Sequence, residues 1–307
     1  MRIASFLPSA TEILFAIGAG EDVCAVTFEC DYPPAARGKP QVVFSHLPPG
    51  LTPAEIDAIV SAEGAQGRSL YFVDLPGLQA LEPSLVVLQD LCRVCAIDSP
   101  TLARDMARLG GDAGPSPRVI SLSAHSLQGV FAEIELLGDA TGRSAQAQTL
   151  TRHLRERVAR ASSPSRHLPW PRVLCLEWLD PPFQGGHWIP EMVALAGGIP
   201  VLATPGEKSV RITWQQVLEA DPEIVVVMPC GYNLAETVEQ FLALTLPAGW
   251  GTLSAVRNGR VFAVNGSAYF SRPGPRLVDG LEILHAILRG EGFAGLPAES
   301  VTPLACS

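Results

Sequence analysis

Two segments of the chain repeat one local plan: the end of a helix, an acidic residue near a proline, and a run of apolar residues. The first is "LEPSLVVLQ", residues 81–89, and the second is "EADPEIVVVM", residues 219–228. Apolar runs that are bounded by helices indicate parallel strands covered on both faces. Because this plan recurs in the same order in both halves, we predict an α/β fold with two lobes, each with its own small, mainly parallel sheet.

Local signals place further elements around these strands. Residues 2–7 predict a strand, and in "SATE" Ser9 is expected to cap the next helix while Glu12 reaches back to it. A second helix is expected to begin at Thr52-Pro53, since proline suits the first helical position. The rest of the predicted plan is a strand over 23–27, a strand over 172–179, a helix over 189–198 and a helix capped by Thr213.

Residues 143–163, "RSAQAQTLTRHLRERVARASS", are rich in Ala, Gln, Leu and Arg and contain no glycine or proline. This composition predicts one continuous helix, about 30 Å long at 1.5 Å per residue. We therefore predict an N-terminal lobe over residues 1–140, a linking helix over 141–165 and a C-terminal lobe over 166–307. One stiff linking helix predicts a hinge of small amplitude and a ligand cleft between the lobes.

Charge and apolar content limit the partners. The 307 residues carry a formal net charge of -9, with no run of basic residues, so neither nucleic acid nor an anionic membrane surface is an expected partner. No apolar run approaches the ~20 residues that span a bilayer. Met1 leads directly into "RIASFLP", without the features of a signal peptide. We therefore expect a cytoplasmic protein, or a periplasmic or cell-surface one if the start is truncated.

Aromatic residues gather in the segments that follow the predicted strands, where open α/β sheets bind ligands. An aromatic-lined cleft with few polar groups suits a large, flat or amphipathic ligand, although a single aromatic residue in a loop is more often packed within its own lobe. The residues predicted to line the ligand site are Phe28, Tyr32, Phe44, His46, Trp178, Phe183, Trp188, Tyr269 and Phe270.

The pair Cys92-x-x-Cys95 follows a predicted strand and admits three interpretations. A structural zinc site usually needs two such pairs, and the sequence has only one. A redox pair would open a helix in a thioredoxin-like unit, which the surrounding sequence does not supply. Packed thiols, contact with a ligand or its metal, and a redox pair or disulfide all stay open, and no intrinsic metal site is predicted.

Catalytic motifs are missing from the sequence. G-x-S-x-G, H-E-x-x-H and G-x-x-x-x-G-K-[ST] do not occur. An acid/base set drawn from Glu12, Glu29, Asp31, Glu177 and Asp180 would permit an enzyme that handles a corrinoid. Glu12 has a simpler role as a capping residue and Asp31 as a turn former, and the sequence supplies no catalytic geometry. A non-catalytic binding protein without an intrinsic cofactor is the favoured interpretation.

Several segments resemble the cobalamin-binding branch of the class III periplasmic substrate-binding proteins. They are "RIASFLPSATEILFAIGAGEDVCAVTFECDYPP", "ALEPSLVVLQDLCRVCA", "DPPFQGGHWIPEMVALAGG", "ITWQQVLEADPEIVVVMPCGY" and "VRNGRVFAVNGSAYFSRPGPRLVDGLEIL". They cover most of the chain in the family's order. The resemblance implies binding of a corrinoid, cobalamin or cobinamide, for an importer of the ABC type. A ferric siderophore or haem is the alternative ligand in the same fold.

The resemblance also implies roles for particular residues. Aromatic side chains of both lobes sandwich the corrin in that branch, and the nearest positions here are Phe28, Phe44, Trp178 and Tyr269. Arg272 falls where the family has a polar group at the rim of the cleft. The two glutamates by which the family docks on its permease fall near Pro76 and on Gln215, so both docking acids are predicted to be absent. This departure, together with the expected location, suggests a cytosolic derivative that stores, salvages or delivers a corrinoid.

Overall fold

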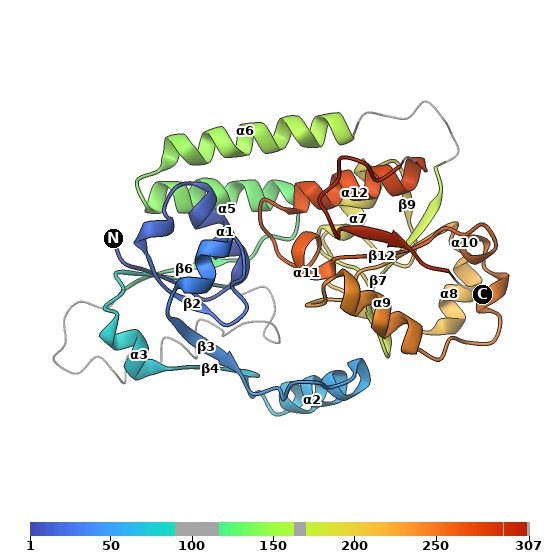
Figure 1. Cartoon of the computed structure of the whole chain (residues 1–307), viewed down its shortest axis with the longest axis horizontal. Helices are drawn as coiled ribbons and strands as arrows, with labels where there is room; N and C mark the ends of the chain where they lie inside the picture. The colour runs from blue at the N-terminus through green and yellow to red at the C-terminus, as the bar shows by residue number, and fades with distance from the viewer. Residues whose placement is uncertain (90–116, 163–169, 291, 306–307) are drawn as a thin grey trace. The chain divides into compact units, whose positions relative to one another are not determined.

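The structure is a computed structural model that describes residues 1–89, 117–162, 170–290 and 292–305 (Figure 1). The chain forms two compact units. Unit 1 consists of Met1–Ala124 and Gln128–Arg152, and unit 2 consists of His125–Leu127 and His153–Ser307. The division falls inside the long helix predicted as a link, whose role as a rigid linker stays a prediction.

The described sheet of unit 1 has the strand order β4-β3-β2-β1-β5-β6. Neighbouring strands run parallel except β3 and β4, which are antiparallel. The chain order reverses between β1 and β5, the kind of switch point at which open α/β sheets bind ligands. The strands are β1 (Ile3–Ser5), β2 (Val23–Thr27), β3 (Gln41–Ser45), β4 (Tyr71–Val73), β5 (Leu85–Gln89) and β6 (Arg118–Leu122).

The described helices of unit 1 begin largely where the sequence predicts. The capping box at Thr52 is confirmed: Thr52 Oγ1 accepts the backbone N–H of Glu55 at 3.3 Å, and Glu55 Oε2 accepts that of Thr52 at 2.8 Å. The cap predicted at Ser9 is wrong, because Pro8 takes the first helical position and Leu7 becomes the N-cap. The helices are α1 (Pro8–Ala16), α2 (Pro53–Ala65), α3 (Leu75–Ala80), α5 (Leu127–Ala140), α6 (Ser144–Ala161), and the 3-10 turns η1 (Gly20–Asp22) and η2 (Pro34–Gly38).

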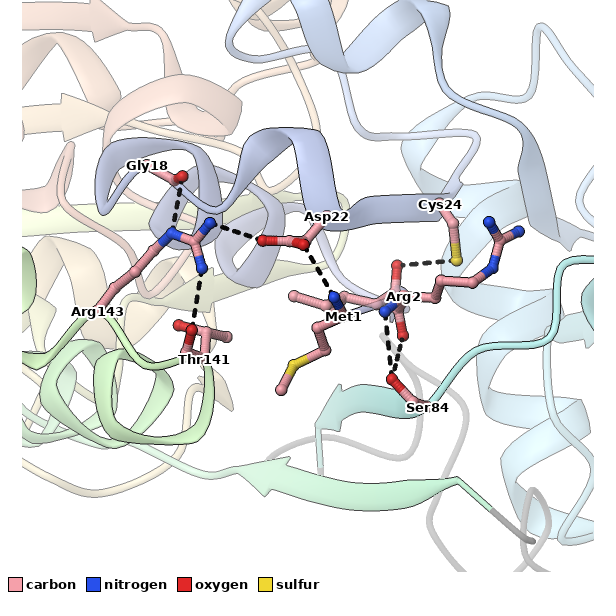
Figure 2. A network of polar contacts seen from close by, with 9 residues as sticks. Met1, Arg2, Gly18, Asp22, Cys24, Ser84, Thr141 and Arg143 are labelled. Atoms are coloured by element: carbon pink, nitrogen blue, oxygen red, sulfur yellow. Dashed lines mark hydrogen bonds and ion pairs between the residues drawn. The ribbon is translucent and has the colours of Figure 1, made fainter.

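Arg143, directly before α6, bonds to the segment that follows α1 (Figure 2). Its Nε donates to the Gly18 carbonyl at 2.8 Å, its Nη1 donates to the Thr141 carbonyl at 2.9 Å, and its Nη2 pairs with Asp22 Oδ2 at 2.7 Å. Asp22 Oδ1 also accepts from the Met1 amino group at 3.1 Å. These bonds fix the turn between α5 and α6 against the β1–β2 side of the unit.

The sheet of unit 2 has the order β10-β8-β7-β11-β12-β13, with β9 paired to β7. Its centre is parallel, as predicted, but β8, β10 and β13 run antiparallel to their neighbours. The predicted strand over 172–179 is confirmed. The strands are β7 (Arg172–Leu179), β8 (Pro182–Gln184), β9 (Ile199–Pro200), β10 (Val210–Arg211), β11 (Ile224–Val227), β12 (Val261–Val264) and β13 (Val301–Pro303).

Short helices surround this sheet, and α12 packs on α7. The predicted cap at Thr213 is confirmed, because its side chain accepts the N–H of Gln216 and a full capping box forms. An apolar core that includes Leu174, Val225 and Trp250 fills the space beneath the helices. The described helices are α7 (Ile189–Leu195), α8 (Trp214–Ala220), α9 (Leu234–Ala243), η3 (Trp250–Thr252), α10 (Ser254–Arg257), α11 (Gly266–Tyr269) and α12 (Leu277–Arg289).

Arg157, in the second half of α6, forms ion pairs with two carboxylates of α12. Its Nε and Nη2 donate to the two carboxylate oxygens of Glu282 at 2.9 and 2.6 Å, and its Nη2 also lies 2.5 Å from Asp279 Oδ1. Bidentate pairs of this kind are among the stronger ion pairs of proteins. The carboxylates and hydrogen bonds raise the pKa of Arg157, with Glu282 the main cause, so the side chain is permanently charged.

We expect Arg157→Ala to lower the free energy of unfolding by about 1–3 kcal/mol, because it leaves two partly buried carboxylates side by side without their cation. Urea denaturation measures the change. Arg152→Ala on the same helix is the control: Arg152 is exposed, and its one hydrogen bond within the described residues is to Thr149 Oγ1, at 3.5 Å. A loss of equal size in both variants would contradict a specific role for Arg157.

Candidate ligand-binding surfaces

An aromatic face lies on the antiparallel strand pair β3 and β4 of unit 1. Phe44 is directly opposite Phe72, with ring centres 5.6 Å apart and planes tilted by 30°. The ring of His46 lies 4.6 Å from that of Phe72, with a similar tilt of 31°. Phe72 is 41% exposed. We call Phe44, His46 and Phe72 the unit 1 aromatic face. Its rings, of which His46 and Phe72 are exposed and Phe44 is half-buried, can contact a flat ligand.

Phe28 belongs to a different group of rings. It follows β2 and its ring lies 6.4 Å from that of Tyr71. Side chains alternate between the faces of a strand, so Tyr71 points to the face opposite Phe72 and packs against the core of unit 1. Phe28 and Phe44, which the sequence predicts to share one surface, therefore contact different aromatic neighbours. Tyr32 is 45% exposed, in the segment that follows.

A second aromatic surface runs across strands of unit 2. Trp178 in β7 is directly opposite Phe183 in β8, and Phe183 is directly opposite Arg211 in β10. The Arg211 guanidinium lies 5.5 Å from the centre of the Phe183 ring, and the Tyr232 ring lies 5.7 Å from the Trp178 ring. Directly opposite residues share a face of the sheet. We call Tyr232, Trp178, Phe183 and Arg211 the unit 2 aromatic row.

Tyr232 supplies a polar group at one end of this row. Its hydroxyl is buried and has no hydrogen-bond partner among the described residues. Burial, and then the charge of Glu236, raises the pKa of the phenol, so the group stays a neutral O–H. A buried hydroxyl without a partner is costly in a folded protein, and a ligand acceptor would satisfy it.

Two of the predicted residues are buried instead. Trp188 is 4% exposed and Phe270 is 2% exposed, and Trp188 Nε1 donates to the Phe270 carbonyl at 2.8 Å. In this structure they hold two loops of unit 2 together. Tyr269, next to Phe270, lies at the end of α11 with the Arg276 guanidinium 5.8 Å from its ring centre, and Arg272 is half-buried.

The remaining predicted positions separate into two cases. Cys92 and Cys95 lie outside the described residues. Near Pro76, the first position predicted to lack a docking glutamate, Asp74 caps α3 by accepting the Gly77 N–H at 3.1 Å. At the second position, Gln215 donates to Glu219 at 2.8 Å on α8. Neither contact tests a permease partner, so the loss of docking stays a prediction.

Sequence reasoning did not single out Phe72, Tyr232 or Arg211 as ligand-site residues in the aromatic surfaces. Phe72 stands in the run "LYFVD", where alternation places neighbouring aromatics on opposite faces, but only pairing with β3 shows which face is exposed. Tyr232 follows β11 in the sequence, and only the fold brings it beside Trp178. The position of Arg211 beside Phe183 depends on strands of two and three residues, which leave little signal in a sequence.

Comparison with known proteins gives the chain a family. A sequence profile described as "Periplasmic binding protein" matches residues 3–268. The chain belongs to the periplasmic binding protein family. Proteins of this family bind ligands rather than carry intrinsic cofactors, as predicted for this chain.

Relatives within the family differ in what their names say they bind. The vitamin B12-binding protein of Vibrio cholerae is 23% identical over 292 residues, covering 92% of this chain and 86% of its own. An ABC transporter substrate-binding lipoprotein of Bacillus subtilis is 22% identical, covering 92% and 78%. The structure of the periplasmic heme-binding protein RhuT from Roseiflexus sp. RS-1 superposes with a TM-score of 0.68 at 23% identity, covering 94% of this chain and 98% of that one.

These similarities confirm the predicted fold class and family. The match to the RhuT structure shows a shared two-sheet α/β architecture. None of the helices in the described residues is both long enough and apolar enough to span a bilayer.

Proposed function

We propose that this periplasmic binding protein binds a corrinoid, such as cobalamin or cobinamide, without catalysis. The observation that carries the proposal is the unit 2 aromatic row, in which Trp178 and Phe183 share one face of the sheet. The unit 1 aromatic face offers a comparable stacking surface. A corrin ring is large, flat and largely apolar, and aromatic surfaces with few polar groups suit such ligands.

The polar groups beside the rings fit the same ligand. The Tyr232 hydroxyl, a neutral donor, matches the amide carbonyls at the edge of a corrin. Trp188 and Phe270 are buried and, in this proposal, hold the ligand loops instead of touching the ligand. Phe28, Tyr32, Tyr269 and Arg272 stay proposed contacts at the edges of the two surfaces. Membership of the family and the relative that binds vitamin B12 support the choice.

Haem is the second candidate, and the arginines favour it. Arg211 lies over Phe183 and Arg276 lies over Tyr269. Guanidinium groups beside aromatic rings would pair with the propionate carboxylates of a porphyrin, whereas the amides of a corrin carry no negative charge. The heme-binding protein RhuT has a similar fold. Membership of the family supports a role as the substrate-binding component of an ABC importer, whichever macrocycle is bound. The predicted loss of both docking acids supports a derivative that stores, salvages or delivers the macrocycle without a permease.

Calorimetric titration with cyanocobalamin, cobinamide and haemin distinguishes these ligands. We expect binding of one corrinoid per chain, and a weakening of about 10-fold or more in Trp178→Ala and in Phe72→Ala, since stacking of one aromatic ring contributes roughly 1–3 kcal/mol. Absorbance of each complex gives a second measure of binding.

The structure offers matched controls in each unit. Leu136 is 42% exposed in unit 1, close to the 41% of Phe72, and Leu242 is 65% exposed in unit 2. Leu136→Ala and Leu242→Ala should leave the affinity unchanged. Binding of haemin alone, weakened in Arg211→Gln, would replace the corrinoid with haem. No binding of either macrocycle would refute the proposed ligand class.

A further inference from the structure

Two histidines of unit 2, His125 and His187, form a pair. The rings of His125 and His187 have centres 5.4 Å apart and planes tilted by 36°. His125 is exposed, and His187 is half-buried with its Nε2 inaccessible and without a hydrogen-bond partner among the described residues. A buried ring nitrogen without a partner needs a physical explanation.

The backbone holds His187 in an unfavourable conformation. Its φ is 53°, in the left-handed region that non-glycine residues seldom adopt. Its N–H donates to the Glu207 carbonyl at 2.5 Å, and its carbonyl accepts the Gly206 N–H at 2.8 Å. The preceding Gly186 has no room for a side chain, since a Cβ would lie 2.2 Å from the Ser209 nitrogen. Strain that the surrounding bonds maintain is commonly found at functional sites.

The loop that carries His125 is also fixed, by a carboxylate at its far end. The Leu127 N–H donates to Glu191 Oε2 at 2.9 Å. Glu191 lies in the first turn of α7, which begins just after His187 and Trp188. This bond joins the backbone beside His125 to the helix that follows His187, so the backbone segments that carry the two imidazoles are connected within unit 2.

The spacing of the rings fits one shared metal ion. With metal–nitrogen bonds of about 2.0–2.1 Å, each ring centre lies about 3 Å from the ion, so two ligating rings have centres on the order of 5–6 Å apart. We propose that His125 and His187 bind a first-row transition metal ion of the Cu²⁺, Ni²⁺ or Zn²⁺ class. Imidazole is a preferred ligand of these ions. This inference is independent of the proposed macrocycle.

The electrostatic surroundings keep His187 in the form that can ligate. Burial, the charge of His125 and that of Lys208 all lower the pKa of His187, and metal binding requires neutral imidazole. No third His, Cys, Asp or Glu completes a cluster within the described residues. The ion would therefore keep open positions, which water or a chelating small molecule can fill.

Calorimetric titration of the full chain with Cu²⁺, Ni²⁺ and Zn²⁺ salts, each alone, tests the site. We expect one ion per chain, with Cu²⁺ bound most tightly. Loss of a residue that supports a metal ligand weakens binding by about 10- to 100-fold. His125→Asn and His187→Asn each remove a proposed ligand, so each should weaken binding by at least this factor. Asparagine tolerates the left-handed region, so His187→Asn is expected to fold, which circular dichroism checks.

His153→Asn is the matched control, because His153 is an exposed histidine of the same unit on α6. Its affinity should equal that of the unaltered chain. Electron spin-echo spectra of the Cu²⁺ complex should show two imidazole nitrogens, and one in each single variant. The proposal is overturned if the His125→Asn/His187→Asn double variant binds as tightly as the unaltered chain, or if His153→Asn loses as much affinity as the site variants.

Discussion

Gly280→Ala is expected to lower the free energy of unfolding by about 3 kcal/mol, the upper part of the range for overpacked cores. A Cβ at this position of α12 would lie 2.3 Å from the Tyr269 carbonyl oxygen, 3.1 Å from Met192 Cε and 3.2 Å from Phe270 Cε1. The closest of these atoms belongs to the backbone, so relief of the overlap requires α12 to move away from the end of α11. Urea or thermal denaturation measures the loss.

Glycine-to-alanine substitution should have the opposite effect on the free energy of unfolding at Gly64. Gly64 is an exposed residue of α2, and a Cβ added there would meet no other atom within 4 Å. Alanine at this position restricts the unfolded chain and suits the helix, which stabilises proteins by about 0.5–1 kcal/mol. If Gly280→Ala were as harmless as Gly64→Ala, close packing of α12 on the Tyr269 loop would be contradicted.

The elements that sequence reasoning placed correctly have strong local signals. The strand Arg172–Leu179 is an apolar run long enough to need burial, and the start of α2 is marked by Thr52, Pro53 and Glu55 together. Even the long α6 follows from composition alone, since nothing in its eighteen residues disfavours a helix. Such features depend on neighbours in the sequence, so one chain is enough to predict them.

The antiparallel strands β8 and β10 at one edge of the unit 2 sheet could not be predicted in this way. The segment "LDPPFQGG" has the prolines and glycines of a loop, and a loop is what the sequence predicts there. In the structure the chain turns back at this segment, and β8 pairs with β7 and β10. The pairing with β10 joins residues far apart in sequence, and the strands are too short to show alternation. Trp178 and Phe183 are therefore opposite neighbours that no local pattern indicates.

Exposure was the other property that the sequence could not supply. Trp188 and Phe270, like Phe72 and Trp178, are aromatic residues near strand ends, and nothing in their local sequence separates the two pairs. Burial depends on what covers each ring: α12 packs close to the Phe270 ring at Gly280, whereas the position of β4 at the edge of the sheet leaves Phe72 open. A list of aromatic residues therefore does not show which rings are exposed.

Trp188→Ala is expected to cost about 3–5 kcal/mol of unfolding free energy, the usual range for loss of a buried aromatic side chain. The indole is 4% exposed, and it also donates to the Phe270 carbonyl at 2.8 Å. Trp188→Phe keeps most of the volume but removes the donor, which leaves that buried carbonyl short of a partner. Its expected cost is about 1–3 kcal/mol. Denaturation curves should therefore show the highest free energy of unfolding for the unaltered chain, a lower one for Trp188→Phe and the lowest for Trp188→Ala.

Trp178→Ala makes the comparison decisive, because Trp178 is a half-buried tryptophan of the same unit in the unit 2 aromatic row. It should cost less stability than Trp188→Ala and, under the proposed function, more ligand affinity. Trp188→Phe should retain binding if, as proposed, the buried ring holds two loops together and does not touch the ligand. If Trp188→Phe instead kept full stability and lost binding, Trp188 would be a direct ligand contact and the division between stacking and packing residues would be wrong.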